Sequence, residues 1–124
     1  MSENFIKISV KTKYINDQSR PKDDQFVYAY TIQIENQGQK TAQLLSRHWR
    51  ITDANDKQQE VQGLGVIGQQ PKIKPGESYS YTSGVVLKTD TGIMTGTYAM
   101  RSDDGDEFEA EIPSFALVKP SALH

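Results

Sequence analysis

Two short stretches of this chain carry the residue types and spacing that could do chemistry, and the first is glycine-rich. Gly63, Gly65 and Gly68 have the spacing of the loop that holds the phosphates in dinucleotide-binding proteins. That loop needs a strand before it and a helix after it, so that the helix N-terminus faces the pyrophosphate. Here Pro71 and Pro75 follow, and no helix can begin and persist between two such breakers. A nucleotide-binding fold is therefore not expected.

A glycine-rich segment can still bind an anion without a helix, because successive backbone N–H groups can form a concave nest. Lys72 and Lys74 follow closely and could add positive charge. Tight backbone packing in a surface loop is the competing explanation for the glycines. The candidate residues of this anion or partner loop are Gly63, Gly65, Gly68, Lys72 and Lys74.

The second stretch is the cationic run around Trp49. Alternate side chains of a strand point to opposite faces, so Arg47 shares a face with Trp49, whereas His48 and Arg50 share the other. Arg47 is expected to lay its stem beside the tryptophan and to extend its charge to the sheet margin. His48 and Arg50 could bind an acidic group or a partner, or form a solvated, ion-paired face.

An acidic turn is the candidate metal site. Asp103, Asp104, Asp106 and Glu107 could hold a divalent cation weakly, although they lack the spacing of a calcium loop. With two histidines and no cysteine, no zinc or cobalt cage can be assembled. A solvated hairpin is the alternative explanation of the cluster.

The residues predict no enzyme and no cofactor. Ser46 and His48 share a strand face, but no carboxylate is placed along the sequence to orient the histidine. Paired carboxylates occur only in turns, where nothing desolvates them enough to tune their acidity. Catalysis is therefore unsupported by any motif.

Composition excludes further function classes. The 124 residues fit one domain, residues 1–124, which is large enough to fold without disulfides or metals. Fourteen basic and sixteen acidic residues give a net charge of −2, which argues against nucleic-acid binding. The absence of cysteine, of a signal-peptide pattern and of a long apolar stretch predicts a cytoplasmic protein without membrane insertion.

Hydrophobic residues recur with period two, which predicts strands throughout. Residues 5–14 predict a strand with one face in water, where Lys7, Lys11 and Lys13 suit an edge position. Residues 25–36 are apolar on both faces and belong in the middle of a sheet. Further strands are expected at 42–52, around 61, and at 78–83, 85–87, 96–102, 107–112 and 115–118.

Seven to nine short antiparallel strands predict an all-β, immunoglobulin-like sandwich, with a small barrel as the alternative. Residues 63–75 are interpreted as a long loop, 103–106 as a hairpin turn, and Pro113 as the end of a strand. Trp49 is expected in the core, and Tyr98 is interpreted as a tyrosine corner that opens a late strand.

Six stretches, in order along nearly the whole chain, resemble the ApaG family. They are residues 36–38, 45–53, 61–71, 75–77, 81–84 and 92–100. The resemblance implies a single ApaG domain with an immunoglobulin/fibronectin III-like β-sandwich. The same domain is appended to F-box proteins and to a protein that interacts with DNA polymerase delta, which implies protein–protein recognition. Bacterial members, also named CorD, are linked to cobalt and magnesium efflux or resistance.

Function is therefore predicted as a non-enzymatic binding module, which uses the 63–74 loop with Arg47, His48 and Arg50. Its partner would be a protein or a small phosphorylated anion. One alternative is an accessory of Co²⁺/Mg²⁺ homeostasis with a weak cation site in the acidic turn. A third is nucleotide or pyrophosphate binding, since the family's gene often neighbours a diadenosine tetraphosphate hydrolase. The sequence leaves a homodimer open.

Overall fold

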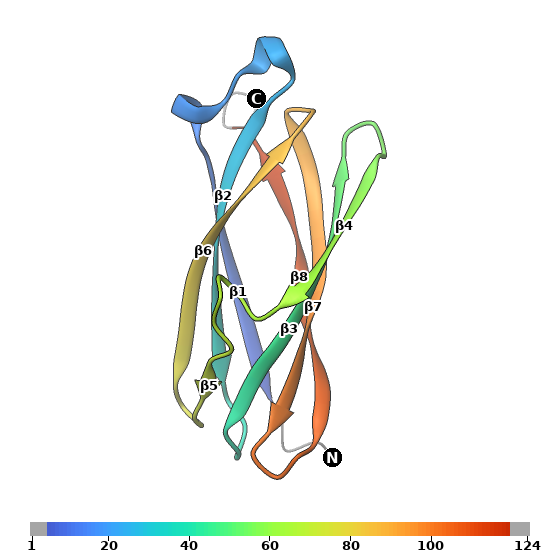
Figure 1. Cartoon of the computed structure of the whole chain (residues 1–124). Helices are drawn as coiled ribbons and strands as arrows, with labels where there is room; N and C mark the ends of the chain where they lie inside the picture. Colours follow the sequence, from blue (N-terminus) through green and yellow to red (C-terminus); the bar gives the residue numbers. More distant parts are fainter. Residues whose placement is uncertain (1–4, 120–124) are drawn as a thin grey trace.

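A computed structural model describes residues 5–119 and shows two antiparallel sheets packed face to face (Figure 1). The described residues form eight strands: β1 (Ile6–Tyr14), β2 (Phe26–Asn36), β3 (Ala42–Asp53), β4 (Gln58–Leu64), β5 (Lys72–Ile73), β6 (Ser78–Leu87), β7 (Thr91–Ser102) and β8 (Glu107–Val118). Two three-residue 3₁₀ turns, Asn16–Gln18 and Pro21–Asp23, separate β1 from β2. Within this part of the chain, no helix is long and apolar enough to cross a membrane.

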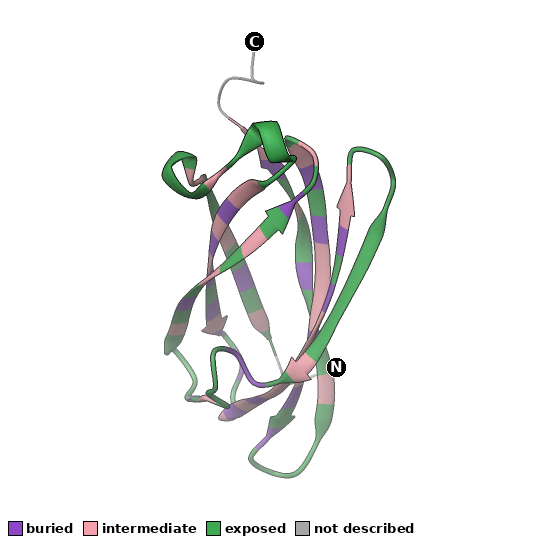
Figure 2. Ribbon diagram, turned by 45° about the horizontal axis from the view of Figure 1, so that its top comes forward, coloured by how far each residue is buried: buried purple, intermediate pink, exposed green. Residues whose placement is uncertain are grey.

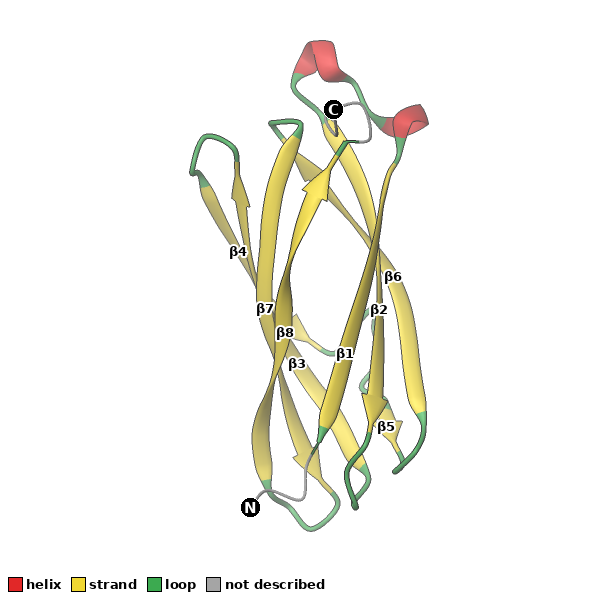
Figure 3. Ribbon diagram, turned by 180° about the vertical axis from the view of Figure 1, so that it is seen from behind, coloured by secondary structure: helices red, strands yellow, loops and turns green. Residues whose placement is uncertain are grey.

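The smaller sheet has the strand order β1-β2-β6, and the larger has the order β4-β3-β7-β8, with β5 pairing to β3. An all-β sandwich and a central β2 are therefore confirmed. The lysine-bearing β1 lies at a sheet edge, as predicted, and stands beside β8 of the other sheet (Figure 3). The immunoglobulin/fibronectin III likeness stays a prediction that this strand order favours. The predicted domain also includes residues 1–4 and 120–124, which lie outside the described range.

The core runs as buried stripes along the facing sides of both sheets (Figure 2). Trp49 of β3 is only 2% exposed, which confirms its predicted place. Its ring meets those of Tyr30, Phe115 and Tyr98 edge-on, at centroid distances of 5.5, 5.8 and 6.4 Å. Such edge-to-face pairs add about 0.5–1.5 kcal/mol each beyond the buried area. The tryptophan of β3 thus packs against aromatic side chains of β2, β7 and β8.

The prediction that Pro113 ends a strand was wrong. β8 continues through Pro113, because the register between β7 and β8 shifts there. Met94 pairs with Phe115 and Gly96 with Ile112, so one residue of β7 lies opposite two of β8. A β-bulge of this kind accommodates a proline that has no N–H to donate to the ladder.

Three further boundaries differ from the prediction. The two strands expected at 78–83 and 85–87 are the single strand β6, because Gly84 continues the ladder with β2. The expected loop 63–75 contains the end of β4 and the short β5. The strand expected from residue 96 begins at Thr91, and the turn at 103–106 is confirmed.

Tyr98 is not a tyrosine corner. It lies in the middle of β7, and its hydroxyl is hydrogen-bonded to that of Tyr81 in the opposite sheet rather than to nearby backbone. Both rings are buried, and burial raises the pKa of Tyr81 to about 12 and raises that of Tyr98 as well. The positive charge of the Arg47 guanidinium lowers the pKa of both hydroxyls and so offsets part of this rise.

Gly96 gives a first prediction about stability. A Cβ at this position would lie 2.6 Å from the His48 carbonyl oxygen and 2.8 Å from the Trp49 ring. We expect Gly96→Ala to lower the free energy of unfolding by about 1–3 kcal/mol, measured by urea denaturation. Gly84→Ala is the matched control, because its Cβ would meet only a carbonyl oxygen at 3.6 Å. Equal stability of the two variants would contradict the packing described.

The tyrosine pair predicts alkaline destabilisation. A phenol whose pKa is raised by folding stabilises the native state fully below its unfolded pKa, and this contribution is lost as the pH rises towards its folded pKa. Between pH 10.0 and about 12, the free energy of unfolding should therefore fall, by about 1.4 kcal/mol per pH unit for each fully titrating group. Urea titrations across this window should show a shallower fall in the double variant Tyr81→Phe/Tyr98→Phe. An unchanged slope would rule out this pair as the cause.

Candidate binding surface

The outer face of the larger sheet carries the chemistry-bearing residues of β3. Because Trp49 and Ile51 point into the core, His48 and Arg50 point outward, as predicted. The strand register then places Gln62 of β4 and Thr97 of β7 on either side of His48. This row continues to Glu111 of β8, and the parallel row through Ser46 and Ala99 continues to Glu109.

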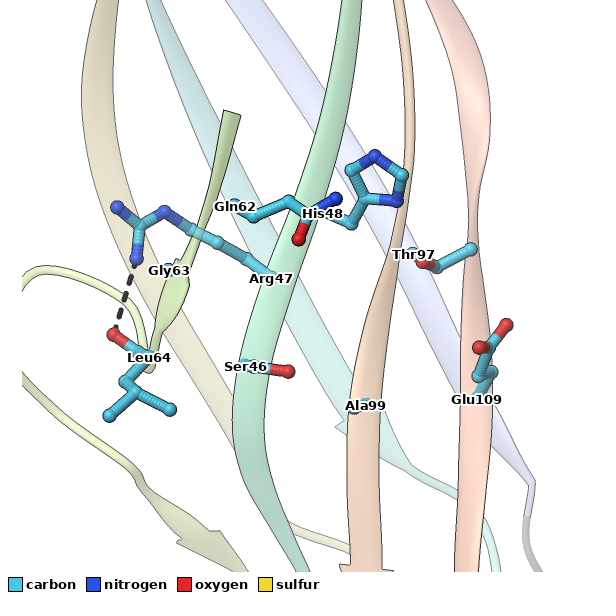
Figure 4. Close-up of a pocket in the computed structure, with 9 residues that line it drawn as sticks. All are labelled: Ser46, Arg47, His48, Gln62, Gly63, Leu64, Thr97, Ala99 and Glu109. Carbon is cyan, nitrogen blue, oxygen red and sulfur yellow. Dashed lines mark hydrogen bonds between the residues drawn. The ribbon is translucent and has the colours of Figure 1, made fainter. Parts of the chain in front are cut away.

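Two adjoining depressions hollow this face, with volumes of about 420 and 350 Å³. His48, Thr97 and Glu109 line both, and we call the combined feature the outer-face groove. Arg47, Gly63 and Leu64 line only the first depression, which Figure 4 shows in close-up. Arg50 and Glu111 line the second. The groove therefore crosses all four main strands of the larger sheet.

A carboxylate does lie beside His48, contrary to the sequence-based expectation. Oε2 of Glu60 is 3.4 Å from Nε2 of His48, and Oε1 of Glu60 is 3.5 Å from Nε of Arg50. Nε2 of His48 is inaccessible to solvent and makes no hydrogen bond to any residue of the range 5–119. The Glu60 carboxylate therefore lies between the imidazole of His48 and the guanidinium of Arg50. No local pattern of residues indicates this contact, because it depends on the pairing of β3 with β4.

Arg47 reaches the sheet margin, as predicted, where it forms hydrogen bonds with the glycine segment. Its guanidinium donates hydrogen bonds from Nη1 to the carbonyl oxygens of Leu64, at 3.2 Å, and Gly65, at 2.9 Å. A Cβ on Gly63 would lie 2.9 Å from the same nitrogen. Gly63 therefore leaves the room through which the Arg47 side chain reaches these carbonyls.

The glycine segment forms a tight turn at Val66–Gln69 instead of a helix start. Ile67 has φ +47° and Gly68 has φ +73°, as in a type I′ turn. A β-branched residue in this region is strained, and Ile67 is also 60% exposed. The N–H groups of Val66 and Gln69 bond reciprocally to each other's carbonyls, at 2.8 and 2.9 Å. The N–H of Gly65 donates to the carbonyl of Leu45.

The two predicted lysines lie away from this groove. Lys72 belongs to β5 and lines a separate hollow with Arg101 and Asp103. Lys74 follows β5, in the turn where its N–H donates to the Glu77 carboxylate. The structure thus brings Gly63 together with Arg47, His48 and Arg50, but it does not bring Lys72 and Lys74 to them.

The acidic turn is held by its own contacts. Lys40 forms an ion pair with Asp104, which also accepts hydrogen bonds from the Ser102 hydroxyl and the Asp106 N–H. Lys40, followed by the Ser102 hydroxyl, holds the pKa of the Asp104 carboxyl well below its usual range. Oε2 of Glu107 forms an ion pair with Nη2 of Arg101, at 3.3 Å. The predicted weak site at Asp103, Asp104, Asp106 and Glu107 stays a prediction, and residues 5–119 contain no group of three His, Asp or Glu side chains that could hold a metal ion.

Comparison with known proteins identifies the family. A family model described as the ApaG domain matches residues 16–102. The chain belongs to the ApaG family. Curated relatives named "Protein ApaG" are 56% identical in Thiobacillus denitrificans and 54% in Dechloromonas aromatica, in each case over 96% of this chain and 94% of the relative. A crystal structure of the putative ApaA protein from Bordetella pertussis is 47% identical, with a TM-score of 0.92 over 94% of this chain and 95% of the other.

Sequence reasoning missed several residues that line the outer-face groove. Thr97 carries no functional signal of its own, whereas Glu109 and Glu111 belong to an acidic stretch visible in the sequence. Their alternation with apolar residues could have placed both carboxylates on one outer face. Which residues of β3 they would meet depends on strand pairing, which the pattern does not specify.

The Arg47 contacts predict a coupling between this side chain and the turn. Arg47→Met keeps the apolar stem but removes the donors to Leu64 and Gly65, so we expect a loss of about 1–3 kcal/mol in the free energy of unfolding. Hydrogen exchange of the amides at 65–69 should accelerate. Arg50→Met is the control, because its exposed ion pair is worth about 0–1 kcal/mol. Unchanged exchange in Arg47→Met would show that Arg47 does not hold the turn.

Proposed function

We propose that this ApaG protein is a non-enzymatic binding module that recognises a segment of a partner protein in the outer-face groove. The observation that carries the proposal is the groove itself, which is solvent-open and lined by charged and hydroxyl-bearing side chains from all four main strands. A peptide segment lying along this groove could form hydrogen bonds and ion pairs with these side chains over its whole length. Interfaces of this kind combine a few apolar anchors with a polar rim.

Charge in the groove favours a basic partner segment. The charge of Glu60 is offset by Arg50, and the charge of Glu107 is offset by Arg101. Glu109 and Glu111 have no ion-pair or hydrogen-bond partner among residues 5–119, and they face solvent on β8. Two unpaired carboxylates on one strand face attract lysine or arginine side chains and repel acidic ones.

Apolar side chains at one end of the groove support a protein partner. Leu64 lines the groove and is 78% exposed, and the neighbouring turn presents the strained Ile67. Exposed aliphatic side chains next to a polar groove are common in interaction sites. Strained residues persist mainly where function retains them.

A phosphorylated anion is less well supported as the ligand. The N–H groups of Gly65, Val66 and Gln69 already donate to backbone carbonyls, and a nest needs such groups to point at the anion. The guanidinium of Arg47 is likewise directed at carbonyl oxygens of its own chain.

The absence of catalysis is part of the proposal. Ser46 and His48 both line the groove, but no hydrogen bond joins them within the described range. The Glu60 carboxylate lies 3.4 Å from Nε2 of the His48 imidazole and 3.5 Å from Nε of Arg50. A nucleophile needs a base within hydrogen-bond reach, oriented by a third group, and this surface does not assemble one.

Charge reversal in the groove tests the proposal. Immobilised wild-type protein should capture a partner from lysate, which is then identified, purified and titrated by calorimetry. Glu109→Lys/Glu111→Lys should weaken its binding about tenfold or more. Asp17→Lys/Asp23→Lys is the matched control, because it makes the same charge change in the 3₁₀ turns between β1 and β2.

Equal losses in both double variants, or no loss in either, would contradict the groove as the site. A titration with inorganic pyrophosphate, followed by NMR, separates the competing ligand class. Saturable shifts confined to the amides of 65–68 would instead favour the anion-binding loop.

A further inference from the structure

Within residues 5–119, strand β4 is an edge of the larger sheet, with β3 as its neighbour and no described strand on its other side (Figure 1). Six of its seven residues are exposed, and the seventh is half-buried (Figure 2). An edge of this kind presents unpaired backbone groups and can add another strand. The question is which strand it accepts.

Two backbone hydrogen bonds at the ends of the β3–β4 pair show which residues of β4 face β3. The N–H of Asp53 donates to the carbonyl of Lys57, and that of Gly65 donates to the carbonyl of Leu45. Residues of an antiparallel strand alternate between directing both backbone groups at the partner and directing both away. By this alternation the odd-numbered residues of β4 face β3, and the backbone groups of Gln58, Glu60, Gln62 and Leu64 point to the free edge.

Charge distinguishes the four sheet edges. β1 exposes Lys7, Lys11 and Lys13, and β8 exposes Glu107, Glu109 and Glu111. Each set of like charges repels a second copy of the same strand. The sole charge between Gln58 and Leu64 is Glu60, which is offset by Arg50 of the same chain at 3.5 Å. β6 is also uncharged, but most of its exposed residues are Ser, Thr or Gly, which offer little apolar surface.

We propose that β4 pairs antiparallel with β4 of a second copy of this chain, about a two-fold axis at Val61. In this register Val61 lies opposite its own copy, Glu60 lies opposite Gln62 of the second copy, and Leu64 lies opposite Gln58. No carboxylate faces another, and the 37% exposed Val61 gains an apolar neighbour at the axis. The Leu64 carbonyl, which accepts from Arg47, keeps a second lone pair for the partner strand.

The pairing joins the larger sheets of two copies and brings their outer-face grooves side by side, because β4 lines both. A partner with two basic segments would then bind with increased avidity. The inference does not depend on the proposed function, since the association is measured on the purified protein alone.

Disulfide trapping tests the axis directly. Opposed residues at a non-hydrogen-bonded antiparallel position have Cα atoms about 4.5 Å apart, within the range that a disulfide spans. The chain has no cysteine, so Val61→Cys introduces a single thiol. Val61→Cys should oxidise to a covalent dimer much faster than Val86→Cys, the matched valine on the uncharged edge of β6. Equal or faster cross-linking at residue 86 would overturn the proposal.

Sedimentation of the cysteine-free protein gives a second test. The wild-type mass should rise towards twice that of the monomer as concentration approaches about 1 mM. Val61→Lys and Val61→Glu should each weaken dimerisation about tenfold or more, and an equal mixture of the two should recover the dimer. Recovery also shows that both variants are folded. A monomeric wild type at about 1 mM, or a mixture that stays monomeric, would overturn the proposal.

Discussion

The Trp49 ring fills the space between the two sheets, and Gly96 lies directly beside it. Three aromatic rings from three other strands close around the indole edge-on. A side chain on Gly96 would overlap both the ring and the backbone of β3, so the closeness of β3 and β7 depends on this glycine. Burial of this one large ring therefore determines which face of β3 points into the core.

The orientation of β3 determines the chemistry of both its faces. With Trp49 inside, Arg47 emerges at the inner margin of the sheet, and His48 and Arg50 lie on the outer face. Arg47 then donates hydrogen bonds to two carbonyl oxygens, one at the end of β4 and one in the segment that follows it. The outer face receives Glu60 from one neighbouring strand and, across Thr97, the carboxylates of β8. The glycine segment of this chain thus forms a turn and is held by Arg47 at one end of the groove.

Charge is distributed unevenly over the edges of the sandwich. The side where β1 meets β8 carries lysines on one strand and glutamates on the other, which discourages further strand pairing. The edge at β4 carries a single charge, on Glu60, and exposes the apolar side chains of Val61 and Leu64. Like charges therefore protect the edges at β1 and β8, whereas the edges at β4 and β6 lack this protection.

Much of this architecture followed from the sequence alone. Period-two alternation determined the all-β class, the central position of β2, the burial of Trp49 and the opposite faces of Arg47 and His48, because side-chain direction in a strand is a local property. Tertiary structure decided the rest. The bulge that carries β8 past Pro113, the pairing of Tyr98 with Tyr81, and the position of Glu60 beside His48 all depend on the register between strands distant in sequence. Register results from packing of the whole core, so no local pattern encodes which side chains become neighbours.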